Sequence, residues 1–143
     1  MNTSRRSISD LLKDSHTIAV VGLSANPARP SHGVARYLQD QGYRIIPVNP
    51  TYAGTHILGE HCYADLRQAA AALKAEGRRI EIVDCFRKAD TLMPIADQAI
   101  EIGAQCLWMQ LGVVNHEAAD KAANAGLMVI MDRCIEIEHI RLE

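Results

Sequence analysis

The chain has 143 residues, 48% of them hydrophobic and 22% charged, and a formal net charge of −2. This length suits one domain with a single core, so we expect one domain over residues 1–143. The small net charge gives no reason to expect a nucleic-acid or membrane-surface partner. Since no run approaches the roughly 18 apolar residues of a transmembrane helix, no membrane span is expected.

The N-terminal segment contains a twin arginine, but charged residues follow it where an export signal needs an apolar stretch, so we interpret it as mature sequence. Ser7 and Asp10 have the spacing of a helix start. The cysteines are widely separated and form no C-x-x-C pair, which predicts no zinc or redox motif. A reducing cytoplasm is the expected location.

Apolar runs of strand length alternate with helix-period segments through the rest of the chain. The runs lack an apolar–polar alternation, which is typical of strands buried on both faces. Asp65 and Asn115 are placed to cap helices. The expected strands cover residues 17–23, 43–50, 80–86, 106–113 and 127–134. This pattern predicts a three-layer Rossmann-like α/β fold with a parallel sheet of order 3-2-1-4-5 and helices on both faces.

Ligands of such folds bind outside the carboxyl ends of the strands, where the strand order reverses. Residues that are unusual for a plain core follow four of the expected strands. A structural explanation is available for each group alone: Pro50 ends a strand, Arg87 is a solvated charge and Gln110 is a core amide with partners. Their common edge favours a ligand site. They are Ser24, Arg29, Ser31, residues 47–50, Phe86, Arg87 and residues 110–112.

The loop after the first strand has the parts of a phosphate site without the three glycines of G-x-G-x-x-G. Gly22 permits a tight turn, and Pro30 suits the first turn of a helix whose N-terminus favours an anion. Ser24 and Ser31 supply hydroxyl donors, and Arg29 supplies a charged fork for phosphate oxygens. The alternative is an Asn-Pro turn with an ordinary serine cap.

The second strand argues against a nicotinamide cofactor. An NAD site needs an acidic residue at the end of this strand to bind the ribose hydroxyls, and no Asp or Glu occurs before Glu60. Prolines there instead offer an apolar wall for an adenine. No catalytic constellation or metal-binding histidine pair is found, so we expect no catalytic residue and no metal site. The adjacent His116 and Glu117 remain an alternative acid–base pair.

With these residues identified, the chain resembles the stand-alone CoA-binding proteins, which are similar to the nucleotide-binding domain of the succinyl-CoA synthetase α subunit. The resemblance rests on five ordered motifs: the stretch from "IAVVGLSANPARPS" to "PVNP", "ILGEHCYADL", "VDCFR", "LWMQLGVVNHEAA" and "AGLMVIMDRC". It implies a Rossmann-like fold that binds CoA or an acyl-CoA along the strand ends. The phosphohistidine domain of the synthetases has no counterpart here, so the resemblance implies binding without turnover.

The resemblance also assigns positions to the ligand. It implies that the loop from Gly22 to Ser31 takes the phosphates, that 48–50 and 86–87 border the nucleotide, and that 110–112 follow the pantetheine arm. The implied cofactor-binding residues are Gly22, Leu23, Ser24, Asn26, Arg29, Ser31, Val48, Asn49, Pro50, Phe86, Arg87, Gln110, Leu111 and Gly112. Cys62, after a Gly-rich stretch, is expected to be the most exposed thiol and to form a mixed disulfide with CoA under oxidation.

Two further readings stay open. One is a nucleotide- or acyl-CoA-dependent enzyme, an oxidoreductase or acyl-transfer enzyme that uses His116 or a cysteine. The other is a protein-interaction module that has lost ligand binding, in which case its protein partner is not identifiable from the sequence.

Overall fold

The computed structural model describes residues 7–142. Five parallel strands form one sheet in the order β2-β1-β5-β6-β7, which confirms the expected Rossmann-like α/β class. The strands are shorter than the apolar runs because the last residues of each run, and in three runs also the first one or two, lie in the adjoining loops. They are β1 (Thr17–Val21), β2 (Arg44–Val48), β5 (Ile82–Cys85), β6 (Cys106–Met109) and β7 (Met128–Ile130).

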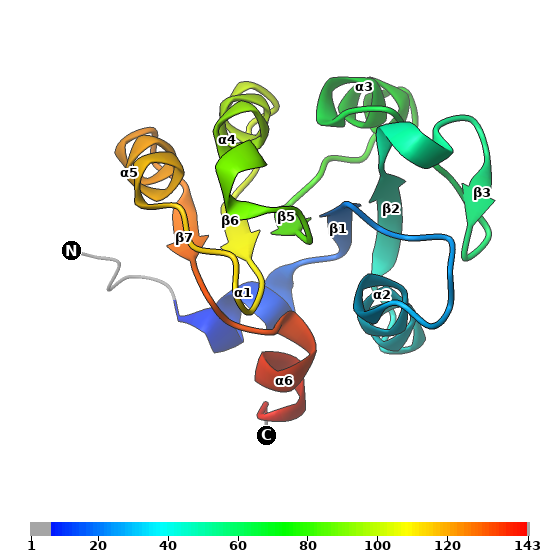
Figure 1. Ribbon diagram of the computed structural model, residues 1–143, viewed down its shortest axis with the longest axis horizontal. Coiled ribbons are helices and arrows are strands. Elements are labelled where there is room, and N and C mark those ends of the chain that lie inside the picture. The colour runs from blue at the N-terminus through cyan, green and yellow to red at the C-terminus, as the bar shows by residue number, and fades with distance from the viewer. Residues whose placement is uncertain (1–6, 143) are drawn as a thin grey trace.

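Helices cover both faces of this sheet, so the molecule has three layers (Figure 1). Two apolar clusters, one on each face, form the core. Helices α1 (Ile8–Asp14), α2 (Pro30–Asp40) and α6 (Ile135–Ile140) pack on the face that carries Trp108. Helices α3 (Leu66–Ala75), α4 (Leu92–Glu101) and α5 (His116–Asn124) pack on the opposite face.

The predicted strand order was wrong in one respect. The third long strand, β5, pairs with β1 and not with β2, so β2 lies at the edge of the sheet. Pro47 gives the physical reason. Its carbonyl oxygen accepts from Tyr63 N on the outer side of β2, and its ring nitrogen, which faces the same side, has no hydrogen to donate to a further strand. The order therefore reverses at β1, and the point of reversal lies between β1 and β5.

Three helix starts agree with the sequence. The side chains of Ser7, Asp65 and Asn115 accept hydrogen bonds from the backbone N–H groups of Asp10, Gln68 and Ala118. Three features were not expected. The final strand ends at Ile130 and the chain then forms α6, and the turn-rich stretch after β2 contains a short 3-10 helix and a two-stranded hairpin.

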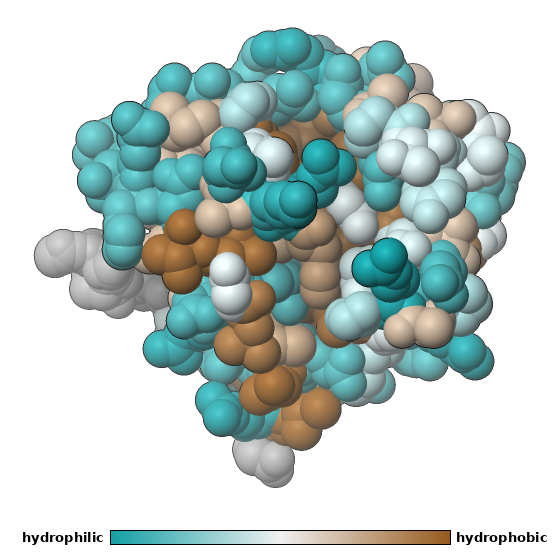
Figure 2. Space-filling model, viewed as in Figure 1, coloured by the Kyte–Doolittle hydropathy of each residue, from teal (hydrophilic) through white to brown (hydrophobic). Residues whose placement is uncertain are grey.

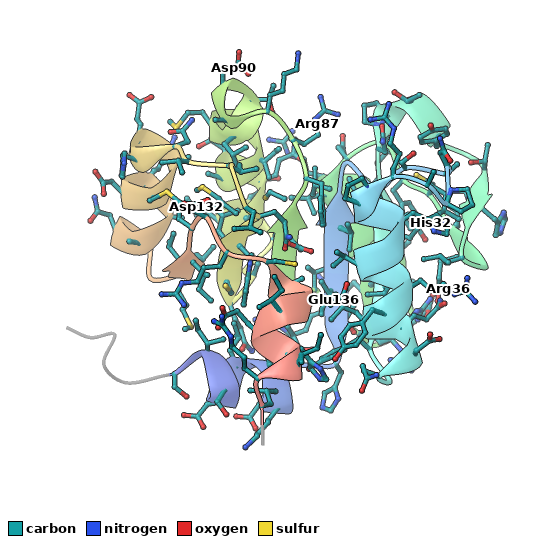
Figure 3. All side chains as sticks on the ribbon, turned by 60° about the horizontal axis from the view of Figure 1, so that its bottom comes forward. His32, Arg36, Arg87, Asp90, Asp132 and Glu136 are labelled. Atoms are coloured by element: carbon teal, nitrogen blue, oxygen red, sulfur yellow. The ribbon has the colours of Figure 1, made fainter. Side chains whose placement is uncertain are left out.

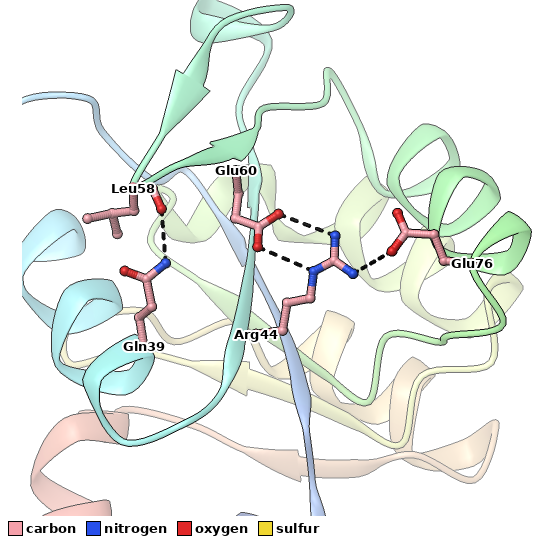
Figure 4. Close-up of polar contacts among 5 residues, drawn as sticks. All are labelled: Gln39, Arg44, Leu58, Glu60 and Glu76. Atoms are coloured by element: carbon pink, nitrogen blue, oxygen red, sulfur yellow. Dashed lines mark hydrogen bonds and ion pairs between the residues drawn. The ribbon is translucent and has the colours of Figure 1, made fainter.

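This hairpin, β3 (His56–Ile57) with β4 (Glu60–His61), covers the outer edge of β2. Tyr63 bridges to Val48 in parallel, and Asn49 N donates to Tyr63 O at 2.9 Å. Arg44, at the start of β2, contacts Glu60 of the hairpin and Glu76 at the end of α3 (Figure 4). The backbone hydrogen bonds to Tyr63 and the ion pairs of Arg44 thus cover the outer edge of β2, which could otherwise pair with a strand of another chain.

The face of the molecule drawn in Figure 2 is mostly polar, with one apolar stripe. Figure 2 shows hydrophobic side chains gathered over the loop after β6 and over α6. The exposed large apolar residues of the described chain are Leu111, Val114, Ile137 and Ile140. Within residues 7–142, no helix combines the length and the hydropathy that crossing a bilayer requires.

Candidate functional site

The loops after β1, β2 and β5 surround a groove at the carboxyl edge of the sheet, beside the point where the strand order reverses. Its first part is a cavity of about 410 Å³ between the loop after β1 and the 3-10 helix η1 (Pro50–Tyr52). This volume is within the usual range for a ligand pocket, roughly 300–1,000 Å³. The predicted residues that line it are Gly22, Ser24, Asn26, Arg29, Ser31, Asn49 and Phe86.

The loop after β1 is held by its own polar side chains. Ser24 N donates to Ser31 Oγ, Asn26 N donates to Ser24 Oγ, and Ala28 N donates to Asn26 Oδ1, each at 3.0 Å. Pro30 occupies the first turn of α2. The N–H group of Ser31, at this helix start, donates to no acceptor among the described residues. A pre-formed loop with a free amide at a helix N-terminus suits an anion.

Gly22 has a role that the sequence did not show. Its φ of +92° is unfavourable for other residues, and a Cβ atom there would overlap the Phe86 carbonyl and lie 2.9 Å from Arg87 Cδ. The absence of a side chain at Gly22 therefore leaves room for the segment after β5, in addition to any room that it leaves for a ligand. This contact places Arg87 over the end of β1.

Asn49 connects the first two loops. It is buried, its Nδ2 donates to Leu23 O at 3.1 Å, and its Oδ1 accepts from Thr51 N at 3.0 Å. It stands where an NAD site requires a carboxylate. Because both ends of the amide are engaged within the protein, Asn49 shapes the groove, and it lacks the negative charge that an acidic residue would bring to ribose hydroxyls.

The groove continues into two further cavities. The second, of about 380 Å³, shares Gly22, Asn49, Thr51 and Phe86 with the first and adds Arg87, Lys88 and Thr91. The third, of about 260 Å³, shares Arg87 and Thr91 with the second and lies between α3 and α4. Its lining is mainly apolar and includes Val21, Val48, Pro50, Leu66, Pro94 and Ile95. The order along the groove is therefore a polar cavity, a cationic cavity and an apolar cavity.

The cations of the groove have no carboxylate partners. Other arginines, such as Arg44, Arg67 and Arg141, form ion pairs. Among the described residues, no carboxylate lies within ion-pair distance of Arg29, Arg87 or Lys88. Figure 3 shows Arg87 and Asp90 in the segment after β5, and His32 and Arg36 along α2. Three unpaired cations around a concave surface favour an anionic ligand.

Four of the predicted residues do not line these cavities. Leu23 is buried in the core. Gln110 is also buried, and its Oε1 accepts from Ile135 N at 3.1 Å. Gly112 N donates to Asp132 Oδ1 at 2.8 Å, and Leu111 is 60% exposed. Gln110 N approaches Cys85 O at 3.4 Å, so the segment from 110 to 112 begins at the next strand end along the same edge, outside the three cavities.

Sequence reasoning missed Thr51, Tyr52, Lys88 and Thr91, which also line the groove. Thr51, Tyr52 and Lys88 lie within two residues of a predicted position, and Thr91 lies four residues after Arg87, so extending the strand-end segments would have found them. The apolar cavity was missed for another reason. It requires α3 and α4 to lie on the same face, and this follows from the strand order that the sequence did not predict.

The expectation for Cys62 was wrong. Cys62 is buried, its Sγ approaches Asn49 O at 3.6 Å, and burial raises the pKa of this thiol. It directly follows the hairpin strand β4 and packs inward with Ile57. Cys134, which precedes α6 and is half-buried, is the most exposed of the four cysteines. A mixed disulfide at Cys62 would require the loop that covers it to open.

The alternative acid–base pair, His116 and Glu117, lies outside the groove. His116 and Glu117 are both exposed at the start of α5 and line none of the three cavities. Within residues 7–142, no three histidine, cysteine or acidic side chains are grouped for a metal ion.

Asp84 is the one fully buried carboxyl group in this region. It lies in β5 between Val20 of β1 and Trp108 of β6, and neither carboxyl oxygen has a hydrogen-bond partner among the described residues. Burial raises the pKa of Asp84 well above its usual range. Its side chain points into the core and does not face the groove.

The fold and the groove define a Rossmann-like α/β protein with a cation-lined groove at the carboxyl edge of its sheet. Comparison with known proteins gives the family: residues 16–140 match the CoA binding domain, and the chain belongs to this family.

Relatives of similar length support the assignment. The uncharacterized protein YneT of Bacillus subtilis is 41% identical over 138 residues, which cover 96% of each chain. A structure from Thermus thermophilus, cell-free ID.343, is 34% identical with a TM-score of 0.87 and full coverage of both chains. A hypothetical protein from Pyrococcus horikoshii is 36% identical with a TM-score of 0.82, over 96% of this chain and 93% of that one.

Proposed function

We propose that this protein binds coenzyme A or an acyl-CoA in the groove and has no catalytic activity of its own. The observation that carries the proposal is the set of unpaired cations, Arg29, Arg87 and Lys88, around a pre-formed loop at the strand ends. Membership of the CoA binding domain family supports the choice of ligand. The absence of a catalytic grouping at the described groove motivates the second half of the proposal.

The groove accommodates the ligand in a definite direction. The pyrophosphate contacts the loop after β1, where the free N–H of Ser31 and the Arg29 guanidinium provide donors. The adenine enters the apolar cavity between α3 and α4, against Pro50 and Ile95. The pantetheine arm leaves the pyrophosphate in the other direction and follows the end of β6 past Leu111. The thiol then emerges beside the exposed apolar stripe.

Arg29→Ala tests the phosphate loop. We expect it to weaken CoA binding by about 1.5–3 kcal/mol, the usual contribution of a hydrogen bond to a charged group. Arg29→Lys should recover part of this loss, because an ammonium group cannot make the two parallel bonds of a guanidinium. The stability of the fold should change little, since Arg29 is exposed and forms no ion pair within the described chain. Isothermal titration calorimetry measures each affinity.

Arg36→Ala is the matched control. Arg36 is exposed on the same helix, two turns after Arg29, and lines none of the three cavities. The Arg36→Ala variant loses the same positive charge as Arg29→Ala, and we expect it to bind CoA with the affinity of the parent. Equal affinities for the parent, Arg29→Ala and Arg29→Lys would contradict the placement of the phosphates. No binding of CoA by the parent, or steady-state turnover of acetyl-CoA that Arg29→Ala abolishes, would contradict the proposed function.

A further inference from the structure

We infer that the middle cavity of the groove recognises the 3′-phosphate of the ligand, through Lys88 and Arg87. This inference rests on the proposed function, because it concerns which part of CoA each cavity receives. It adds a specificity: the protein should distinguish CoA from 3′-dephospho-CoA and from other nucleotides that share the adenosine 5′-diphosphate unit.

The order of the three cavities carries the inference. The first and second share Gly22 and Phe86, and the second and third share Arg87 and Thr91, so the second lies between the others. In CoA, the ribose and its 3′-phosphate likewise lie between the pyrophosphate and the adenine. With the pyrophosphate in the polar cavity and the adenine in the apolar one, the 3′-phosphate falls in the cavity between them.

The chemistry of the middle cavity fits a separate dianionic group. It contains Arg87 and Lys88, neither of which has a carboxylate within ion-pair distance in the described chain. Thr91 also lines it, and its hydroxyl donates to Lys88 O at 2.7 Å and so helps to hold the segment that carries the lysine. Arg29 lines the first cavity and not this one. The groove therefore has two separate cationic centres, whereas a ligand with a pyrophosphate alone requires one.

The position of Arg87 is fixed by packing. The site of a Cβ at Gly22 lies 2.9 Å from Arg87 Cδ, so the aliphatic part of the arginine rests on the glycine at the end of β1. The residue is half-buried, whereas Lys88 is exposed at the rim. A positioned guanidinium with an adjacent ammonium is an arrangement suited to a phosphate monoester.

The test compares the affinities of CoA and 3′-dephospho-CoA by calorimetry for the parent, Lys88→Ala, Arg87→Met and the control Lys74→Ala. Arg87→Met keeps the apolar stem that rests on Gly22 and removes the charge. Lys74 is exposed in the last turn of α3 and lines none of the cavities. We expect the parent and Lys74→Ala to prefer CoA by about tenfold, a contribution typical of bonds between charged groups. The preference should fall several-fold in Lys88→Ala and in Arg87→Met.

The outcomes separate this inference from the proposed function. If the parent binds neither compound, the proposed function is wrong. If the parent binds both equally well, CoA binding stands and the 3′-phosphate site is wrong. A preference for CoA that persists unchanged in both Lys88→Ala and Arg87→Met would place the 3′-phosphate elsewhere in the groove and would also overturn the inference.

Discussion

Gly22 allows the segment after β5 to pack against the end of β1. Comparing its substitution by alanine with that of another glycine separates this packing role from the effect of glycine on backbone flexibility. Gly22→Ala should destabilise the protein by at least about 1–2 kcal/mol, the cost of a left-handed conformation for an L-residue. Overlap with the Phe86 carbonyl adds to that cost. Denaturant unfolding monitored by circular dichroism measures the change.

Gly33→Ala is the control for this prediction. Gly33 lies inside α2 with nothing near the position of its Cβ. An alanine there should stabilise the helix by roughly 0.5–1 kcal/mol. Equal effects of the two substitutions would show that the loop from β5 does not need the space that Gly22 provides.

Asp84 should make the stability of the protein depend on pH. Burial raises the pKa of Asp84 in the folded state, so between the unfolded pKa of about 3.9 and the raised folded pKa the native protein holds a proton that the unfolded chain releases. The free energy of unfolding therefore falls as the pH rises through this window. Asp84→Asn should remove this contribution and be more stable than the parent at neutral pH, with an advantage that shrinks towards pH 4.

Urea unfolding of both proteins across that pH range measures the effect, and Asp120→Asn, on the exposed side of α5, is the control. A difference between Asp84→Asn and the parent that stays constant with pH would show that the buried carboxyl group does not titrate as described. Asparagine keeps the size of the side chain, so loss of packing does not obscure the result.

At the scale of elements, the sequence predicted the existence and type of the long segments well. The apolar runs became the five strands of the sheet, and Ser7, Asp65 and Asn115 became helix caps, because these signals are local in the chain. Strand order is not local, since β5 satisfies the same pattern beside β1 or beside β2. The deciding residue was Pro47, whose missing N–H suits an edge strand, and this signal was present in the sequence.

In the candidate site, too, the local features could be predicted from the sequence and the non-local ones could not. Residues directly after β1, β2 and β5 were predicted and do line the groove, because parallel strands bring their carboxyl ends to one edge. Side-chain direction was not predictable at Gln110 and Cys62. Both point inward and bond to backbone atoms from distant segments, which no local pattern encodes.

Asn115 connects two elements and gives a test at this scale. Its Oδ1 caps α5 by accepting from Ala118 N at 2.9 Å, and its Nδ2 donates to Ala89 O, beside Lys88, at 2.8 Å. Asn115→Ala should cost about 0.5–2 kcal/mol of stability through the lost cap. Asn115→Asp keeps the cap, but it replaces the second donor by a carboxylate oxygen that faces the Ala89 carbonyl and adds a negative charge.

Thermal unfolding and calorimetry with CoA together resolve the two roles of Asn115. We expect Asn115→Asp to retain most of the stability and to bind CoA more weakly than the parent, because the segment that carries Lys88 is less firmly held. If Asn115→Asp is as unstable as Asn115→Ala, the capping interaction is not the main contribution of this residue.

At the scale of the molecule, the groove depends on contacts between distant parts of the chain. The pairing of β1 with β5 brings together residues such as Ile18 and Ile82, and the loops after both strands line the same cavities. Such long-range pairing slows folding, because chain entropy is lost before the contacts form. We expect saturating CoA to slow unfolding and to leave the refolding rate nearly unchanged, since only a late species has the complete groove.

Stopped-flow refolding and unfolding with and without CoA measure these rates. A refolding rate that rises with CoA concentration would mean that the phosphate loop binds before β5 is in place.

After β2 the chain crosses over to place β5 on the other side of β1, so the two sides of the groove are synthesised at different times. The first half, through β2, already contains the loop from Gly22 to Ser31 and Asn49, yet it lacks the segment after β5 that closes the groove. If CoA binds in the groove as proposed, a nascent chain should not retain it until the segment that carries Arg87 and Lys88 has left the ribosome. On this proposal the ligand would stabilise only the nearly complete domain, because it would contact loops from both sides of the point where the strand order reverses.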